Sequence, residues 1–214
     1  MTKRKVSALE QLIDDKKLVQ VTVGQRVLRP DEFPSMIYRV KSGSLRLLFS
    51  SCERRGVQTL TKIDVGNWIG LSNFLYGEPC EWVSASTDAI LEAISIETLK
   101  EKIWSDPKLL NEVVSLNHPH IIANSLKKWI TSLAKPPLNQ DSFIRTILAE
   151  SRLVSLENLI LDKTYQTEFT LIGANHSSGS IGQEIKYDQL KSLTSTDYKS
   201  PILILAIPTK FLET

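Results

Sequence analysis

The sequence predicts a mainly β protein that also contains helices: a double-stranded β-helix (jelly roll), then a helical connector and a small C-terminal α+β or β region. Three observations lead to this prediction. From Leu18 to Ile96, short runs rich in Val, Ile and Leu alternate with turn residues, which is typical of the short strands of a sandwich or barrel. From Pro107 to Ser151, apolar residues recur at helical spacing. After Leu153 the strand pattern returns, with a polar loop rich in Gly and Ser.

Changes in this pattern divide the chain of 214 residues into three parts. We expect residues 1–106 to form the roll with an N-terminal helix, residues 107–152 the connector, and residues 153–214 the C-terminal region. A hydrophobic content of 42% is enough for a buried core in one large domain or two small ones.

Turn signals around Gly24, Gly43 and Gly66 help to place the strands of the roll. An N-terminal helix is expected over 7–17, with Ser7 as its N-cap. The expected strands are 18–23, 25–28, 36–41, 44–50, 58–63, 81–85 and 89–95.

Prolines and caps mark the helices of the connector. Pro107 and Pro119 each suit the first position of a helix, and Asp141 is expected to cap another that runs to about Ser151. A further helix precedes them over 97–105, and strands are expected at 168–173 and 201–207. The block from Pro107 to Leu133 is expected to pack within the chain; the alternative is a helix that forms a homodimer.

Charge and cysteine content narrow the partners and the compartment. The formal net charge is only +2, so nothing demands a nucleic acid or an anionic membrane. Cys52 and Cys80 match neither a metal motif nor a disulfide framework. The longest apolar run, from Ile202 to Ile207, is far too short to cross a bilayer. A cytoplasmic location is expected, although the chain could be a domain of a membrane protein.

Four short patterns follow one another in the first half: a glycine turn at Gly24, the hairpin sequence 38–47, the turn 64–70, and the strand sequence 82–96. In this order and at these separations they resemble the cyclic-nucleotide-binding roll of catabolite-activator-like proteins, protein kinase A regulatory subunits and gated ion channels. The resemblance implies a ligand-sensing fold. In that family, a short helix after the glycine matching Gly70 and a later arginine hold a cyclic phosphate.

The chain departs from that family at the charged residues of the phosphate-binding cassette. Leu71 stands where the family has a glutamate, and residues 79–81 include no arginine; none occurs between Arg55 and Arg145. A charge-assisted hydrogen bond contributes about 1.5–3 kcal/mol, so losing both partners would weaken binding roughly a hundredfold or more. Glu81 would also repel a phosphate. The sequence therefore disfavours cyclic AMP and cyclic GMP, and no cofactor is expected.

A closer resemblance covers residues 66–87, where Cys80-Glu81 lies near the position of the family's arginine. A similar variant cassette occurs in the N-terminal roll of cyanobacterial ABC transporters that export peptides and toxins. This resemblance extends loosely over 169–182 and 202–208. It implies a non-enzymatic regulatory domain, the cytoplasmic front end of an inner-membrane transporter or a stand-alone relative, with transporter or other protein domains as its partners.

The converted cassette is the candidate site for a small ligand, if the chain binds one. One alternative is a genuine sensor of a cyclic nucleotide or another small molecule. A second is a catabolite-activator-like transcription regulator, but 143–153 has too few basic residues for a recognition helix, so a nucleic acid is not favoured. The candidate ligand-binding residues are Gly70, Leu71, Ser72, Pro79, Cys80, Glu81, Trp82 and Val83.

Three other groups have a structural interpretation that we favour over a functional one. Cys80 is expected to be a small buried residue rather than a thiol sensor. His118 and His120 have no third or fourth ligand nearby, so no metal site is expected. The loop 173–180 lacks the spacing of a phosphate-binding motif and is expected to be mobile. No catalytic constellation can be assembled from the sequence.

Overall fold

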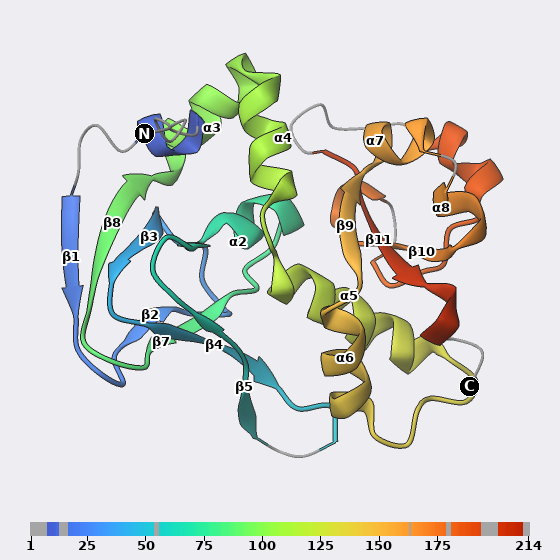
Figure 1. The fold of residues 1–214 in the computed structure, drawn as a ribbon, viewed down its shortest axis with the longest axis horizontal. Coiled ribbons are helices and arrows are strands. Elements are labelled where there is room, and N and C mark those ends of the chain that lie inside the picture. The colour runs from blue at the N-terminus through green and yellow to red at the C-terminus, as the bar shows by residue number, and fades with distance from the viewer. Residues whose placement is uncertain are drawn as a thin grey trace, which may run out of the picture.

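The computed structural model describes residues 8–12, 17–53, 56–162, 164–178, 181–193 and 201–211. Two four-stranded sheets occupy the first half of the chain, and a three-stranded sheet ends it. Figure 1 shows the helices α4, α5 and α6 between the first two sheets and the third. The predicted fold class, a roll followed by helices and a small region with strands, is confirmed.

All the strand pairs of the roll are antiparallel, with the orders β1-β8-β3-β6 and β2-β7-β4-β5. The seven predicted strands agree with the structure within two residues at either end. The two-residue strand β6 was not predicted; it pairs with Tyr38 and Arg39 of β3. The strands are β1 (Lys17–Val21), β2 (Arg26–Leu28), β3 (Met36–Ser42), β4 (Leu45–Ser50), β5 (Val57–Ile63), β6 (Trp68–Ile69), β7 (Trp82–Ala85) and β8 (Ala89–Ser95).

The N-terminal helix is described only in part. Helix α1 covers Ala8–Gln11, whereas the predicted cap Ser7 and residues 13–16 lie outside the described residues. Leu9 is fully buried, and α1 packs against α4. Leu9 of α1 therefore belongs to the same core as the connector.

Prolines open two of the connecting helices, as predicted. Pro107 and Pro119 stand in the first turns of α4 and α5. The predicted helix after residue 140 is present as α6, but its predicted cap was wrong: Asn139 is the N-cap, and its side chain accepts a hydrogen bond from the Ser142 N–H. Asp141 instead accepts from the Ser51 hydroxyl (2.5 Å) and ties α6 to the end of β4. The helices are α2 (Leu71–Tyr76), α3 (Ile96–Ser105), α4 (Pro107–Ser115), α5 (Pro119–Ser132) and α6 (Gln140–Leu148).

Helix α5 lies inside the molecule. Apolar residues on several sides of it, among them Ile121, Leu126 and Ile130, are fully buried, and it contacts α2, α6 and β10. The expectation that the block from Pro107 to Leu133 packs within the chain is therefore correct for α5. A surface for a homodimer would have to lie elsewhere.

The C-terminal sheet has the antiparallel order β10-β11-β9. Strands β10 (Phe169–Gly173) and β11 (Leu203–Pro208) match the two predicted strands closely, whereas β9 (Arg152–Ser155) was not predicted. Leu203 and Leu205 of β11 join the core of the roll and α5, while Ile204 belongs to a second, smaller core. Also present are the short helices α7 (Leu156–Leu161), α8 (Thr164–Thr167), η2 (His176–Ser178), η3 (Tyr187–Ser192) and η4 (Thr209–Phe211).

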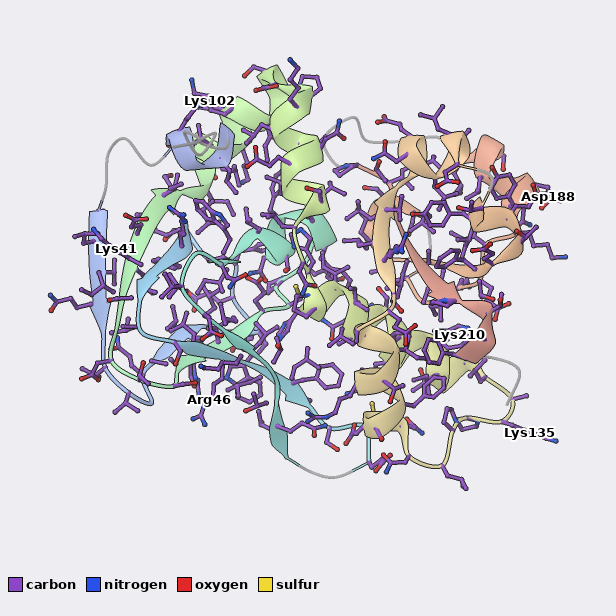
Figure 2. All side chains as sticks on the ribbon, viewed as in Figure 1. Lys41, Arg46, Lys102, Lys135, Asp188 and Lys210 are labelled. Atoms are coloured by element: carbon purple, nitrogen blue, oxygen red, sulfur yellow. The ribbon has the colours of Figure 1, made fainter. Side chains whose placement is uncertain are left out.

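Lysines are dispersed over the surface. The labelled side chains of Lys41, Lys102, Lys135 and Lys210 lie at widely separated points of the periphery (Figure 2). No helix among the described residues is long and apolar enough to cross a membrane.

Candidate functional site

The candidate cassette begins at Gly70, which precedes the short helix α2. Gly70 has a φ of +95°, and a Cβ at this position would lie 3.0 Å from the Ile37 side chain. Both features favour glycine over any larger residue. Leu71 and Ser72 follow and are buried, as are Cys80 and Glu81 at the other end of the cassette.

The Glu81 carboxyl group lies at the start of α2. Its side chain is buried, with the residue only 4% exposed, and Oε2 accepts hydrogen bonds from the Gly70 N–H and from Asn73 Nδ2 (3.1 Å). The hydroxyl and the backbone N–H of Ser72 also interact with this carboxyl group. Free N–H groups at a helix start are the donors that bind an anion. In this chain an internal carboxyl group already takes them.

Asn73 holds the two ends of the cassette together. It is fully buried, and its Oδ1 accepts from the N–H groups of Cys80 (2.6 Å) and Glu81 (3.1 Å). Its Nδ2 donates to the Glu81 carboxyl group. Sequence analysis missed Asn73; the available signal was a polar residue among the apolar residues of a short helix.

Burial raises the pKa of Glu81 to about 7, and the hydrogen bonds from Ser72 and Gly70 oppose this shift. Ser72 also faces a histidine. The Ser72 hydroxyl lies 3.3 Å from His118 Nδ1, and its one hydrogen cannot serve both His118 and Glu81. A protonated Glu81 can donate to Ser72, which then donates to His118.

The two histidines, which we expected to be structural, join the connector to the cassette. His118 is buried and its Nε2 donates to the Val113 carbonyl oxygen (2.7 Å), which leaves Nδ1 as an acceptor. Burial lowers the pKa of His118 to about 4, so the ring is neutral at pH 7. No group of three or more His, Cys, Asp or Glu side chains in the described parts of the chain is placed to hold a metal ion.

His120 joins the connector to both sides of the roll. One ring nitrogen faces the Cys80 carbonyl oxygen and the other lies 2.7 Å from the Leu48 carbonyl oxygen. Burial lowers the pKa of His120, while these two acceptors favour the doubly protonated ring and oppose the shift. The start of α5 is thereby held against β4 and against the end of the cassette.

The remaining predicted residues divide into core and surface. Val83 and Leu71 pack into the core, and Cys80 is buried with a raised thiol pKa caused mainly by burial. Pro79 and Trp82 line a different hollow of about 210 Å³, beside α5. The structure thus brings together Gly70, Ser72 and Glu81 of the predicted set, and separates them from these two.

Little room remains around the Glu81 carboxyl group. Two hollows of about 60 and 70 Å³ adjoin it, and Trp68 and Asn117 line both. Pockets for drug-sized ligands have volumes of about 300–1,000 Å³. The two hollows next to Glu81 are both smaller than this range.

The loop 173–180, which was expected to be mobile, is held in place where it is described. Asn175 is buried, and its Nδ2 donates to the carbonyl oxygens of Leu75 (3.0 Å) and Pro201 (2.7 Å). Its Oδ1 accepts from the N–H groups of Ser178 and Leu203. Residues 179 and 180 lie outside the described residues.

No model of a known protein family matches the chain, and no curated protein matches it significantly. Solved structures similar to it include a cyclic nucleotide-binding domain from Methylobacillus flagellatus, 20% identical over 49% of this chain and 59% of its own, with a TM-score of 0.42. A transcriptional regulator from Thermotoga maritima is 18% identical over 50% of this chain and 84% of its own (TM-score 0.42). The catabolite activator protein of Thermus thermophilus is 17% identical over 66% and 82% (TM-score 0.44).

Proposed function

We propose that this chain is a non-catalytic regulatory domain of the cyclic-nucleotide-binding type whose cassette is filled by its own Glu81, so that it binds neither cyclic AMP nor cyclic GMP. The observation that carries the proposal is the buried Glu81 carboxyl group, which takes the Gly70 N–H at the start of α2. Any phosphate in the same place would have to displace this group.

The position of Glu81 opposes a phosphate in two ways. The N–H groups of Gly70 and Ser72 already interact with the carboxyl group, so an incoming anion gains a hydrogen bond only when an internal one is lost. In its ionised form, Glu81 also repels an anion at close range in a poorly screened interior. No arginine is present in the cassette to offset either effect.

The filled cassette links the roll to its connector instead. His118 contacts Ser72 at the start of α2, and His120 contacts Cys80 at the end of the cassette. Any displacement of α4 or α5 therefore disturbs both ends of the cassette. Such a link suits a domain that transmits a conformational change and carries out no reaction.

The finer proposal is a relationship to the cytoplasmic N-terminal region of a peptide- or toxin-exporting ABC transporter. It rests on the sequence resemblance over 66–87. The test is whether the natural reading frame continues past Thr214 into apolar membrane spans and a Walker motif. A natural stop at this point, with no transporter subunit bound by the purified protein, would contradict it.

A regulator that binds DNA is less well supported. Strand β9 begins at Arg152, four residues after α6 ends at Leu148, and it enters a sheet. Helix α6 ends at Leu148, so a single recognition helix over the whole of 143–153 is not supported.

The central test is the melting temperature of the protein with millimolar cyclic AMP or cyclic GMP, with AMP at the same concentration as a control for ionic effects. We expect no saturable rise for either cyclic nucleotide. A saturable rise specific to one of them would refute the proposal, because a ligand that binds only the folded state must stabilise it.

Chemical rescue tests the role of Glu81 directly. We expect Glu81→Ala to lower the melting temperature and formate to restore part of this loss by occupying the vacated position. The matched control is Glu78→Ala, which changes an exposed glutamate of the same segment. Formate that has the same effect on wild type, on Glu78→Ala and on Glu81→Ala would show that Glu81 does not fill an anion position.

A further inference from the structure

The outer face of the sheet β2-β7-β4-β5 carries a row of positive charges. Arg26 of β2, Arg46 of β4 and Lys62 of β5 are all exposed. The strand register places Ser84 of β7 opposite both arginines, and it places Arg46 opposite Lys62. Arg46 Nε donates to the Ser84 hydroxyl (3.1 Å), and the Arg46 side chain lies at the periphery of the molecule (Figure 2). Three cations therefore cross the four strands in one row.

The pair formed by Arg46 and Lys62 is unfavourable for the sheet itself. Like charges directly opposite each other on neighbouring strands are destabilising. Lys62 has an ion pair with Asp64 (2.9 Å). Within the part of the chain that the structure describes, no carboxylate forms an ion pair with Arg26 or Arg46, and Asp31 near Arg26 pairs with Arg29 instead (3.0 Å). The charges of the two arginines are therefore available to a negative partner.

Apolar side chains continue this face beyond the row of cations. Trp82 of β7 and Leu48 of β4 are paired across the two strands, and both are half-buried. The Arg26 guanidinium group lies over the Trp82 ring, 5.9 Å from its centroid. Arginine and tryptophan are the residue types enriched among the side chains that dominate the energy of protein interfaces.

A hollow of about 210 Å³ adjoins Trp82 and Leu48, where this sheet meets α5. Pro30 and Pro79 add apolar walls. Lys127 supplies a cation to the wall, and its Nζ donates to the Ser50 carbonyl oxygen (3.3 Å). The described residues of the wall include no carboxylate. The volume is below the range of about 300–1,000 Å³ for whole ligands, so it suits a single apolar side chain.

We propose that this outer face binds an extended, acidic segment of a partner protein, with one apolar side chain of that segment in the hollow. Carboxylates of the segment would pair with Arg26, Arg46 and Lys62, and one beside the apolar side chain would pair with Lys127. Complementary charge of this kind sets the choice of partner and the rate of association. A nucleic acid would present a longer run of negative charge than these four cations can match.

This inference goes beyond the proposed function and does not depend on it, because the buried Glu81 carboxyl group takes no part in the outer face. The two can therefore fail separately. Cys80 and His120 line the hollow and also contact each other in the link between the cassette and the connector. A side chain in the hollow would thus touch residues that hold this link.

The test uses a fluorescein-labelled peptide of sequence GDEDFDEDG, with binding to the full chain measured by fluorescence anisotropy. We expect saturable binding that weakens as salt is added, because exposed ion pairs are screened. Replacing the phenylalanine of the peptide by alanine should weaken binding about tenfold, through the loss of a buried aromatic side chain. The uncharged peptide GNQNFNQNG should not bind.

Variants of the protein locate the binding face. Loss of one exposed ion pair weakens binding about two- to fivefold, so the double variant Arg26→Ala, Arg46→Ala should weaken it about five- to twentyfold. The matched control is the double variant Lys102→Ala, Lys135→Ala, which removes the same charge at exposed positions far from Arg46 (Figure 2). This control should leave the affinity nearly unchanged.

Stability measurements separate loss of a contact from loss of folding. Arg46→Glu places an acid opposite Lys62 and so replaces a like-charged pair by an opposite-charged one. The melting temperature should therefore stay the same or rise. The affinity for the acidic peptide should nevertheless fall further than in Arg46→Ala.

Four results would overturn the inference. The first is the absence of saturable binding of the acidic peptide at millimolar concentration and low salt. The second is an equal loss of affinity in the two double variants. The third is an Arg46→Glu variant that is less stable than wild type, because the cation row would then serve the fold. The fourth is tighter binding of a single-stranded oligothymidylate or of phosphatidylserine vesicles than of the peptide, because the face would then select a nucleic acid or a membrane.

Discussion

Replacement of Glu81 by glutamine tests how the filled cassette responds to pH. The ordinary pKa of a glutamic acid is near 4.5, and burial raises that of Glu81 to about 7. The folded state therefore retains a proton that the unfolded state has lost in this interval. The contribution of Glu81 to stability is fully present below about pH 4.5 and is lost as the pH rises through about 7.

The magnitude follows from the same two values. Each pH unit between them corresponds to about 1.4 kcal/mol. Relative to Glu81→Gln, which does not titrate, wild type should thus lose about 3 kcal/mol of unfolding free energy between pH 4.5 and pH 8. The glutamine places an N–H₂ group near the donors of Ser72 and shifts the absolute stability, but this offset does not vary with pH.

Urea unfolding of both proteins at half-unit steps across this interval measures the difference. Subtracting the variant cancels the titration of other groups, including His118. A difference that stays flat would refute the raised pKa. A difference that increases with pH would show the reverse, a carboxylate stabilised in its ionised form by Gly70 and Ser72. Glu81→Met, which also cannot titrate, should show the same slope as Glu81→Gln.

Three further predictions concern the same region and its scaffold. Burial lowers the pKa of His118 to about 4, so the contribution of His118 to stability is present above its ordinary pKa of 6.5 and is lost as the pH falls. In urea unfolding, wild type should therefore gain stability relative to His118→Gln from pH 4 to pH 7. A loss of stability over this interval would contradict the lowered pKa. Asn73→Ala should cost about 2–4 kcal/mol, because the buried N–H groups of Cys80 and Glu81 lose their acceptor and the Glu81 carboxyl group loses one of its donors. Asn67→Ala, at an exposed amide, should cost less than about 1 kcal/mol. Equal losses would show that Asn73 does not hold the cassette. Gly43→Ala should destabilise the roll much more than Gly24→Ala. Both glycines have φ near +80°, but only at Gly43 would a Cβ overlap the Asp88 carbonyl oxygen. Similar melting temperatures for the two variants would refute this steric explanation.

Most of the roll could be predicted because its signals are local. Turn residues such as Gly43 and runs of β-branched residues lie next to each other in the chain, and the strands they predict agree with the structure closely. Strand β6 was missed because two residues are too few to show an alternation, and β9 was missed because it pairs with β11, which lies far along the chain. Asp141 was misassigned because a cap at Asn139 two residues earlier was equally compatible with the sequence, and the contact with Ser51 is distant in the chain.

The candidate site was predicted only in outline because its contacts join separate segments. Residues 70–72 and 79–83 could be placed near each other from the resemblance alone. The contact of Ser72 with His118 spans 46 residues, and that of His120 with Leu48 spans 72. Nothing in the spacing of the two histidines indicates those partners. Their structural role was predicted from the lack of further metal ligands, which is an argument by exclusion.

Glu81 shows how the structure changes the meaning of a substitution. From the sequence, this residue is an unfavourable charge near a lost phosphate site. In the structure its carboxyl group accepts a hydrogen bond from the Gly70 N–H, and under the proposed function it occupies the place of the phosphate. Loss of the arginine is consistent with this arrangement, because an internal acid that is about half protonated at pH 7 carries only part of a negative charge for a buried cation to balance. The absence of the arginine and the presence of Glu81 are therefore two parts of one change, and reversing either one alone should fail to restore nucleotide binding.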